Sequence, residues 1–199
     1  MQVDSQALDR SKGALYGLAI GDALGMPSQT LSRAEIAQHY GRIEDFVAPF
    51  ADHPVSHGLS AAQVTDDTEQ SLLLARRLLL DPQGFDDLGW ARDLMGWEAD
   101  IRARGLRDLL GPSSKAALNA LIGGASPEVT GLHGTTNGAA MRVAPVGITT
   151  PPEPAQIVRR VAMTCRVTHN TGEAIAGASA VAMVVSAGIA GLGFEEAVP

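Results

Sequence analysis

The sequence is poor in the residues that build disulfide-rich and β-rich proteins. It has one cysteine among 199 residues, Cys165, which excludes an internal disulfide and a cysteine-based zinc site. Aromatic residues make up only 4% of the chain, whereas strands are enriched in aromatic and β-branched residues. We therefore predict an all-α fold, a compact array of closely packed helices. The apolar stretch VAMTCRV predicts that Cys165 is a buried free thiol.

Positive charge is also scarce. Only two lysines occur, Lys12 and Lys115, and the formal net charge is −7. A groove that follows nucleic-acid phosphates requires clustered lysine and arginine, so we expect no nucleic-acid groove. An acidic cleft would instead attract cations.

Signals for export or membrane insertion are weak. The N-terminal stretch MQVDSQALDR lacks the basic-then-apolar pattern of a signal peptide, so we expect a cytoplasmic protein. Residues 174–193 form an uncharged run as long as a membrane span, but they are rich in alanine, glycine and serine. We expect this run to be a helix buried among other helices, and we expect no membrane partner.

Length and hydrophobic spacing indicate one domain over residues 1–199. The first helix is expected to start after Asp4 or Ser5 as the capping residue, and the last long helix after Thr171. Residues 41–64 are expected to form a long loop in which His53 and His57 are solvated. Helices are predicted at residues 5–24, 33–40, 65–80, 86–103, 113–122, 154–166 and 171–191, with a short helical segment from Gly138 onward.

Four glycines in the first predicted helix recur at every fourth position, at residues 13, 17, 21 and 25. Each glycine in a helix interior costs about 1 kcal/mol relative to alanine. The repeated cost predicts a compensation, most simply a second backbone packed very close to this stripe.

The stretch TDDTE, residues 65–69, gathers three carboxylates and two hydroxyls at the start of a helix. Asp66 and Glu69 match a capping box, which accounts for two of the acids. Asp66 and Asp67 lie about 100° apart around the helix, so both can flank one point beyond its N-terminus. Adjacent carboxylates and a threonine hydroxyl suit a hard cation such as Mg²⁺ or Mn²⁺. Simple capping and metal binding both remain open on this evidence.

Two further polar stretches flank predicted helices. In TTNGAAMR, Asn137 and Gly138 form a strong turn signal, which is compatible with a plain turn or with a loop that holds an anion. In THNTGEAIAGASA, His169 precedes a helix, where a histidine is either structural or catalytic.

Four blocks in this order resemble the ADP-ribosylglycohydrolase family: GALYGLAIGDALGMPSQ, TDDTEQSLLLARRL, NGAAMRVAPVGI and THNTGEAIAGA. The resemblance covers residues 10–193. It implies an all-α ADP-ribosylglycohydrolase-like fold with a binuclear Mg²⁺ centre, sometimes Mn²⁺. It also implies hydrolysis of an N- or O-glycosidic bond at the ribose anomeric carbon of ADP-ribosylated substrates.

The resemblance also assigns roles to residues of this chain. Asp22 looks like a residue near the cleft. The implied metal ligands are Thr65, Asp66 and Asp67. The implied catalytic residues are Asp66, Asp67 and Gln29. The residues implied in binding ADP-ribose are Thr135, Thr136, Asn137, Gly138, Met141 and His169.

Two departures from the family pattern shape these expectations. Gln29 stands where many relatives have a glutamate, and an amide cannot act as a general base although it can orient a water. The family's C-terminal Asp-x-Asp-Thr/Ser motif does not occur in the 199 residues. We therefore expect a domain that is incomplete at its C-terminus, lacks half of the metal site and has little or no hydrolase activity.

The substrate is left open by the same departures. The leading expectation is an ADP-ribosylated protein. The Gln29 replacement slightly favours a small ribosyl or glycosyl compound. A non-catalytic module that binds ADP-ribose or a nucleotide is the third possibility.

Overall fold

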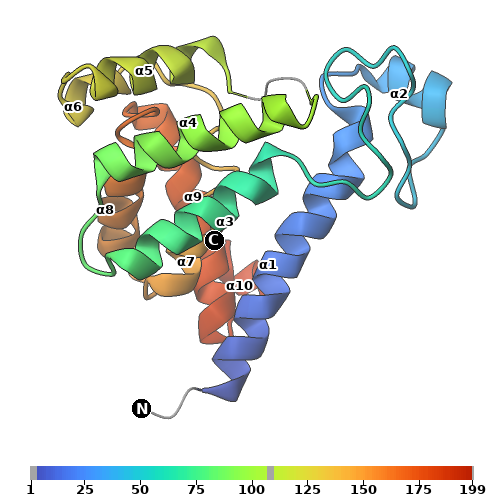
Figure 1. The fold of residues 1–199 in the computed structure, drawn as a ribbon. Helices are drawn as coiled ribbons and strands as arrows, with labels where there is room; N and C mark the ends of the chain where they lie inside the picture. The colour runs from blue at the N-terminus through green and yellow to red at the C-terminus, as the bar shows by residue number, and fades with distance from the viewer. Residues whose placement is uncertain (1–3, 107–109, 199) are drawn as a thin grey trace.

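The computed structural model describes residues 4–106 and 110–198, and within these residues every regular element is helical, as predicted (Figure 1). The long helices are α1 (Ser5–Gly25), α3 (Asp66–Leu80), α4 (Asp87–Ala103), α5 (Pro112–Ile122), α8 (Pro154–Cys165) and α9 (Gly172–Ala190). The short ones are η1 (Met26–Ser28), α2 (Arg33–Tyr40), α6 (Pro127–Thr130), α7 (Ala144–Thr149) and α10 (Phe194–Ala197). The segment from Gly138 is a series of turns up to Val143, so the helix predicted there starts later, at Ala144.

The predicted caps are present at both ends of the chain. The Asp4 side chain accepts a hydrogen bond from the Gln6 amide at the start of α1. The Thr171 side chain accepts one from the Ala174 amide at the start of α9. Each side chain satisfies an amide that has no partner inside its helix, and this explains why local sequence sufficed to place these helices.

The core lies where α3, α4, α7, α8 and α9 meet, and α1 packs along its edge against α3, α7 and α9. In Figure 1, α1 is the long helix that carries α2 and the loop of residues 41–64 at its far end. The largest fully buried apolar side chains are Trp90, Met26, Leu74, Leu94, Ile101, Leu118 and Ile157. Cys165 is also buried, as predicted, and burial raises the pKa of its thiol.

Helix α9 packs small residues against α7 and α8, so the prediction of a helix buried among others holds for one face only. A Cβ atom at Gly147 of α7 would lie 2.6 Å from the Ala182 carbonyl oxygen, so the close approach of these helices requires glycine there. Among the described residues, α9 is the one helix that is long and apolar enough to cross a membrane, and 33% of its most apolar stretch is buried.

The glycine stripe of α1 does not pack against another backbone, which makes that prediction wrong. A Cβ atom added at Gly13, Gly17, Gly21 or Gly25 would meet nothing within 4 Å. Three of these glycines, at positions 17, 21 and 25, instead line an open cleft. The stripe therefore leaves space along α1 and does not serve close helix packing.

The loop of residues 41–64 is held by a ring contact with α2 and by the buried His53. The Phe50 ring stacks on His39 of α2 with 3.8 Å between ring centroids. His53 is only 1% exposed, and its Nδ1 accepts hydrogen bonds from the Val55 and Ser56 amides. The prediction that His53 is solvated is therefore wrong, because its ring closes the turn that follows it. His57 is partly exposed.

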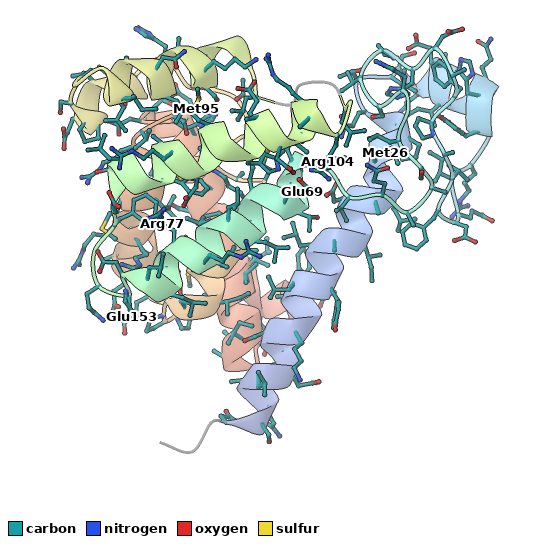
Figure 2. The ribbon with its side chains drawn as sticks, in the orientation of Figure 1. Met26, Glu69, Arg77, Met95, Arg104 and Glu153 are labelled. Carbon is teal, nitrogen blue, oxygen red and sulfur yellow. The ribbon has the colours of Figure 1, made fainter. Side chains whose placement is uncertain are left out.

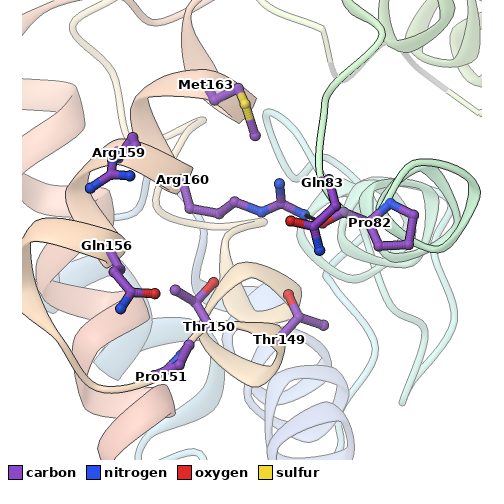
Figure 3. Close-up of a pocket in the computed structure, with 9 residues that line it drawn as sticks. All are labelled: Pro82, Gln83, Thr149, Thr150, Pro151, Gln156, Arg159, Arg160 and Met163. Carbon is purple, nitrogen blue, oxygen red and sulfur yellow. Dashed lines mark hydrogen bonds between the residues drawn. The ribbon is translucent and has the colours of Figure 1, made fainter.

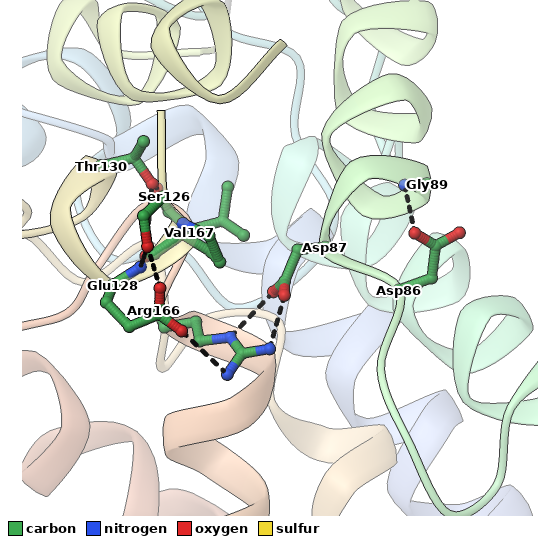
Figure 4. A network of polar contacts seen from close by, with 9 residues as sticks. Asp86, Asp87, Gly89, Ser126, Glu128, Thr130, Arg166 and Val167 are labelled. Atoms are coloured by element: carbon green, nitrogen blue, oxygen red, sulfur yellow. Dashed lines mark hydrogen bonds and ion pairs between the residues drawn. The ribbon is translucent and has the colours of Figure 1, made fainter. Parts of the chain in front are cut away.

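The segment between α8 and α9 is fixed by an arginine (Figure 4). Arg166 donates from Nε and Nη2 to the two carboxylate oxygens of Asp87, at 3.0 and 2.5 Å, and its Nη1 lies 3.7 Å from Glu128. This bidentate contact fixes the orientation of the guanidinium relative to the carboxylate more strictly than a single hydrogen bond does. It anchors the backbone that carries Thr168 and His169 to α4 and α6.

Candidate active site

The N-terminus of α3 is capped by a carboxylate from a different helix. Asp22 of α1 accepts hydrogen bonds from the amide and hydroxyl of Thr65, at 2.8 and 2.7 Å. It also accepts from the amide and hydroxyl of Thr68, at 3.2 and 2.6 Å. Four donors therefore satisfy Asp22, and its negative charge faces the positive end of the α3 dipole.

The predicted capping box of Asp66 and Glu69 is absent. Thr65 is the capping residue by backbone geometry and makes no side-chain capping bond. Glu69 instead accepts a hydrogen bond from Trp97 Nε1 at 2.5 Å and pairs with Arg104 at 3.0 Å (Figure 2). With Asp22 as the cap and Glu69 joined to α4, neither Asp66 nor Asp67 is needed to start the helix.

Asp66 and Asp67 carry negative charge at an energetic cost. Burial, the charge of Asp67 and the charge of Asp22 raise the pKa of Asp66 to about 7. Burial and the charge of Asp22 raise the pKa of Asp67 as well. Asp66 acts electrostatically on the buried Arg142 guanidinium, where its charge opposes the lowering of the Arg142 pKa by burial. Perturbed carboxylates of this kind are typical of functional sites.

These carboxylates line a cleft of about 690 Å³ between α1, α3 and the segment that precedes α7. It brings together residues far apart in the sequence: Gly17, Gly21, Asp22, Gln29, Thr30, Asp66, Asp67, Asn137, Met141 and Val181. Thr30 has a positive φ of 60°, a conformation that β-branched residues rarely adopt. The turn that places Gln29 at the cleft is therefore strained.

Several predicted site residues do not line this cleft. Thr65 is buried, and its hydroxyl is hydrogen-bonded to Asp22 and, at 3.4 Å, to Asp67. Thr135 and Thr136 are exposed beside the cleft residue Asn137. Gly138 separates this loop from His169, because a Cβ atom at Gly138 would lie 2.6 Å from His169 Cε1.

His169 is a buried, neutral ring behind the Asn137 loop. Its Nε2 lies 2.9 Å from the Thr136 hydroxyl and its Nδ1 lies 2.9 Å from the Thr168 hydroxyl. Burial and the positive charge of Arg142 lower the pKa of His169 to about 4. His169 therefore acts at neutral pH as an uncharged hydrogen-bonding group.

Arg142 and Thr168 are the site residues that sequence reasoning missed. Arg142 is 2% exposed and donates to Gln70 Oε1 at 2.8 Å and to Thr168 Oγ1 at 2.7 Å. Its guanidinium lies 5.4 Å from the centre of the Trp90 ring. Burial lowers the pKa of Arg142, against the opposing effect of Cys165 and Asp66. The signal in the sequence was a single arginine inside the apolar stretch AAMRVAPVGI.

A second cavity, of about 330 Å³, contains none of the predicted site residues (Figure 3). It is lined by Thr149, Thr150, Arg159 and Arg160, among others. The Arg160 guanidinium donates to the Pro82 carbonyl at 2.5 Å, so it is occupied in holding the loop that follows α3. The cleft with Asp66 and Asp67 is the stronger candidate because it gathers the perturbed carboxylates.

The donor set of the cleft suits a hard cation, although the described residues contain no group of three or more histidine, cysteine, aspartate or glutamate side chains that could hold a metal by themselves. Asp66 and Asp67 offer carboxylate oxygens, and the Thr65 hydroxyl oxygen lies 3.4 Å from Asp67. Asp22 is already occupied by its four donors. A divalent cation beside Asp66 and Asp67 would relieve the repulsion that raises their pKa values.

The described residues thus form an all-α domain in which two adjacent carboxylates of raised pKa line one cleft, a candidate cation site. The sequence pattern of ADP-ribosylglycohydrolases matches residues 3–199, and the chain belongs to this family. A solved structure described as an ADP-ribosylglycohydrolase-related protein complex superposes with a TM-score of 0.75 and 26% sequence identity. That superposition covers 98% of this chain and 61% of the solved one, and it confirms the predicted fold.

Curated relatives agree with this assignment. The chain is 36% identical over 184 residues to the uncharacterized protein YegU of Escherichia coli K12. This alignment covers 92% of the chain and 55% of YegU. It is 32% identical over 174 residues to the ADP-ribosyl-[dinitrogen reductase] glycohydrolase of Rhodospirillum rubrum. This alignment covers 81% of the chain and 52% of that enzyme. The ADP-ribosylarginine hydrolase Tri1 of Pseudomonas putida is 32% identical over 85% of this chain and 44% of its own length. The chain thus spans about half the length of the curated relatives it matches.

Proposed function

We propose that the 199 residues form the acidic cleft of a divalent-cation-dependent hydrolase of the glycosidic bond at the ribose anomeric carbon of ADP-ribosylated substrates, and that they alone give little or no turnover. The observation that carries the proposal is that Asp66 and Asp67, with raised pKa values, line one cleft with Asn137 and Gln29. The names of two relatives, an ADP-ribosyl-[dinitrogen reductase] glycohydrolase and an ADP-ribosylarginine hydrolase, support the substrate class.

Each cleft residue has a role that its chemistry allows. Asp66 and Asp67 would hold Mg²⁺ or Mn²⁺, which when bound supplies positive charge for polarising a water and sugar hydroxyls. Asn137 and Met141, on the loop before α7, would contact the ribose. Gln29 orients a water or a hydroxyl through its amide and cannot take up a proton as a base. The open glycine positions of α1 leave room for the ligand beside the carboxylates.

One observation favours a second candidate. Gln29 lines the cleft in the place where the family pattern has a glutamate, and an amide there removes one negative charge from the site. The alternative substrate is a small ribosyl or glycosyl compound, in keeping with the resemblance of the GMPSQ stretch to relatives of that kind.

Cation-dependent ligand binding tests the proposal. Calorimetric titration with ADP-ribose is expected to show tighter binding in excess Mg²⁺ than in EDTA for the wild type and for Asp9→Asn, the control for removal of one exposed acid on α1. The double variant Asp66→Asn, Asp67→Asn is expected to lose the Mg²⁺ effect. ADP-ribose affinity that is independent of Mg²⁺ and unchanged in the double variant would contradict the proposal and indicate a non-catalytic binding module.

Turnover assays separate the substrate classes. Release of ADP-ribose from arginine- or serine-linked peptides, dependent on Asp66 and Asp67, supports the proposed substrate. Hydrolysis of free nucleosides with no reaction on the peptides would replace it with the small-compound alternative.

A further inference from the structure

Arg142 is a buried cation that the roles assigned above do not use. Its guanidinium is 2% exposed, and its hydrogen-bond partners, Gln70 and Thr168, are both uncharged. Burying a cation costs free energy, which is reduced here by two hydrogen bonds, by the face of the Trp90 ring and by the negative charge of Asp66. A group retained at this cost points to a role beyond packing.

The Arg142 guanidinium constrains the hydrogen bonds around it. A guanidinium has only donors, so the Thr168 oxygen must accept from Arg142 Nη2. The single hydroxyl proton of Thr168 is then free for its other neighbour, His169 Nδ1, at 2.9 Å. If Nδ1 carried a proton and donated it to the Thr168 oxygen, the hydroxyl proton of buried Thr168 would have no partner among the described residues. The arrangement that pairs every group has Thr168 donating to Nδ1 and the proton of the neutral ring on Nε2.

The same logic continues to the surface of the loop. His169 Nε2–H donates to the Thr136 oxygen at 2.9 Å, which leaves the Thr136 hydroxyl proton without a partner among the described residues. Thr136 is exposed and adjacent to Asn137, a cleft residue. Thr136 therefore presents a hydrogen-bond donor beside a residue that lines the cleft.

We propose that Arg142 is a positioning residue that selects the Nε2–H tautomer of His169 through Thr168 and thereby makes Thr136 a donor to an acceptor oxygen of the ligand. A ribose or phosphate oxygen has this chemistry. Only the identification of the ligand as ADP-ribose rests on the proposed function. The tautomer itself is a property of the free protein.

The packing around the ring supports this role. Gly138 lies against one side of His169, where a side chain would overlap Cε1 and Nε2. The Thr171 hydroxyl donates to the Gly134 carbonyl at 2.9 Å, and the Asn170 amide donates to the Gly131 carbonyl at 2.8 Å. These bonds hold the two loops together around the ring, whose two nitrogens each lie beside a threonine hydroxyl.

The ring-nitrogen spectrum of His169 tests the proposal directly. In ¹⁵N-labelled protein at pH 7, with the signals assigned by their loss in His169→Gln, the wild type is expected to show a protonated Nε2 and an unprotonated Nδ1. Arg142→Met is expected to populate both tautomers, which moves the two nitrogen shifts toward each other. Arg142→Lys, which keeps a cationic donor, is expected to restore much of the wild-type pattern. Thr168→Ala is expected to act like Arg142→Met, and Thr168→Ser like the wild type.

Several outcomes would overturn the proposal. A wild-type ring protonated on Nδ1 contradicts it without any variant, so the test does not depend on the folding of Arg142→Met. A folded Arg142→Met protein with a lower unfolding midpoint and an unchanged His169 spectrum would show that Arg142 is merely structural.

Ligand binding tests the second half of the proposal. Thr136→Val is expected to weaken ADP-ribose binding about tenfold relative to Thr136→Ser, the loss of one hydrogen bond. Equal affinities of these two variants would contradict the donor role of Thr136. The ring spectrum needs no ligand, so a failure of wild-type protein to bind ADP-ribose would contradict the proposed function alone.

Discussion

Replacing Asp66 with asparagine is expected to stabilise the protein when no cation is bound. The folded-state pKa of Asp66 is raised from 3.8 to about 7, so the folded protein binds more protons than the unfolded chain between these pH values. Stability therefore falls as the pH rises from about 4 to about 7 and is lowest above that range. The Asp66→Asn variant has an uncharged amide at this position, which does not titrate and does not contribute to this slope.

The size of the effect follows from the pKa shift. A shift of about three units corresponds to about 4 kcal/mol, which is an upper limit because Asp66 keeps partial contact with solvent. We expect about 2 kcal/mol of stabilisation for Asp66→Asn at pH 8. At pH 4 the two proteins should be nearly equal, because Asp66 is then protonated in the folded state.

Urea unfolding in EDTA at pH 4, 6 and 8 measures this difference, with Asp9→Asn as the control for removal of one surface charge. Residual pH dependence in Asp66→Asn is expected from Asp67, whose pKa is also raised. Parallel stability profiles of wild type and Asp66→Asn across this pH range would refute the reasoning that the α3 carboxylates are held at a cost.

Three further substitutions test separate parts of the structure by urea unfolding. Asp22→Asn is expected to destabilise the protein by about 2 kcal/mol, because the four donors at the α3 N-terminus lose their charged acceptor. An unchanged unfolding midpoint would show that α3 does not depend on this cap. Thr30→Gly is expected to stabilise by about 1 kcal/mol through relief of the positive φ of Thr30, and clear destabilisation would be evidence against strain there. Gly138→Ala is expected to lower the free energy of unfolding by about 1–3 kcal/mol and to shift the His169 ring signals, because the added Cβ atom overlaps that ring. An unfolding midpoint and ring signals equal to those of the wild type would contradict the close contact.

Local signals in the sequence were sufficient to place most of the helices. Helix α1 begins after the Asp4 cap and α9 after the Thr171 cap, at positions where a single side chain satisfies the first amides. Helix α7 was misplaced because the Asn137–Gly138 turn is followed by further turns up to Val143. No single residue in the sequence signals that the helix starts only at Ala144.

The contacts that sequence reasoning missed join distant segments. The cap of α3 is Asp22, 43 residues before Thr65, so the local match of Asp66 and Glu69 to a capping box was misleading. The glycine stripe of α1 showed that side chains are excluded there, but a glycine pattern does not reveal whether a backbone or an open cleft lies opposite.

The buried histidine and arginine were missed for the same physical reason. A polar residue can be buried when its partners are supplied by other segments, and those partners are not visible beside it in the sequence. His53 closes a turn with two backbone amides, and Arg142 finds Gln70 and Thr168 across the core. The resemblance to ADP-ribosylglycohydrolases identified the acidic stretch TDDTE and a different histidine, His169. It gave no indication of which atoms around these residues donate hydrogen bonds and which accept them.

Counting bound Mn²⁺ by electron paramagnetic resonance tests the central claim most directly, since free and protein-bound Mn²⁺ give distinct signals. At pH 8 the wild type and Asp9→Asn are expected to bind the ion saturably, and lowering the pH to 5 is expected to release it as Asp66 takes up a proton. The double variant Asp66→Asn, Asp67→Asn is expected to leave the ion free. Equal Mn²⁺ binding by the double variant and the wild type would contradict the assignment of the α3 N-terminus as the cation site.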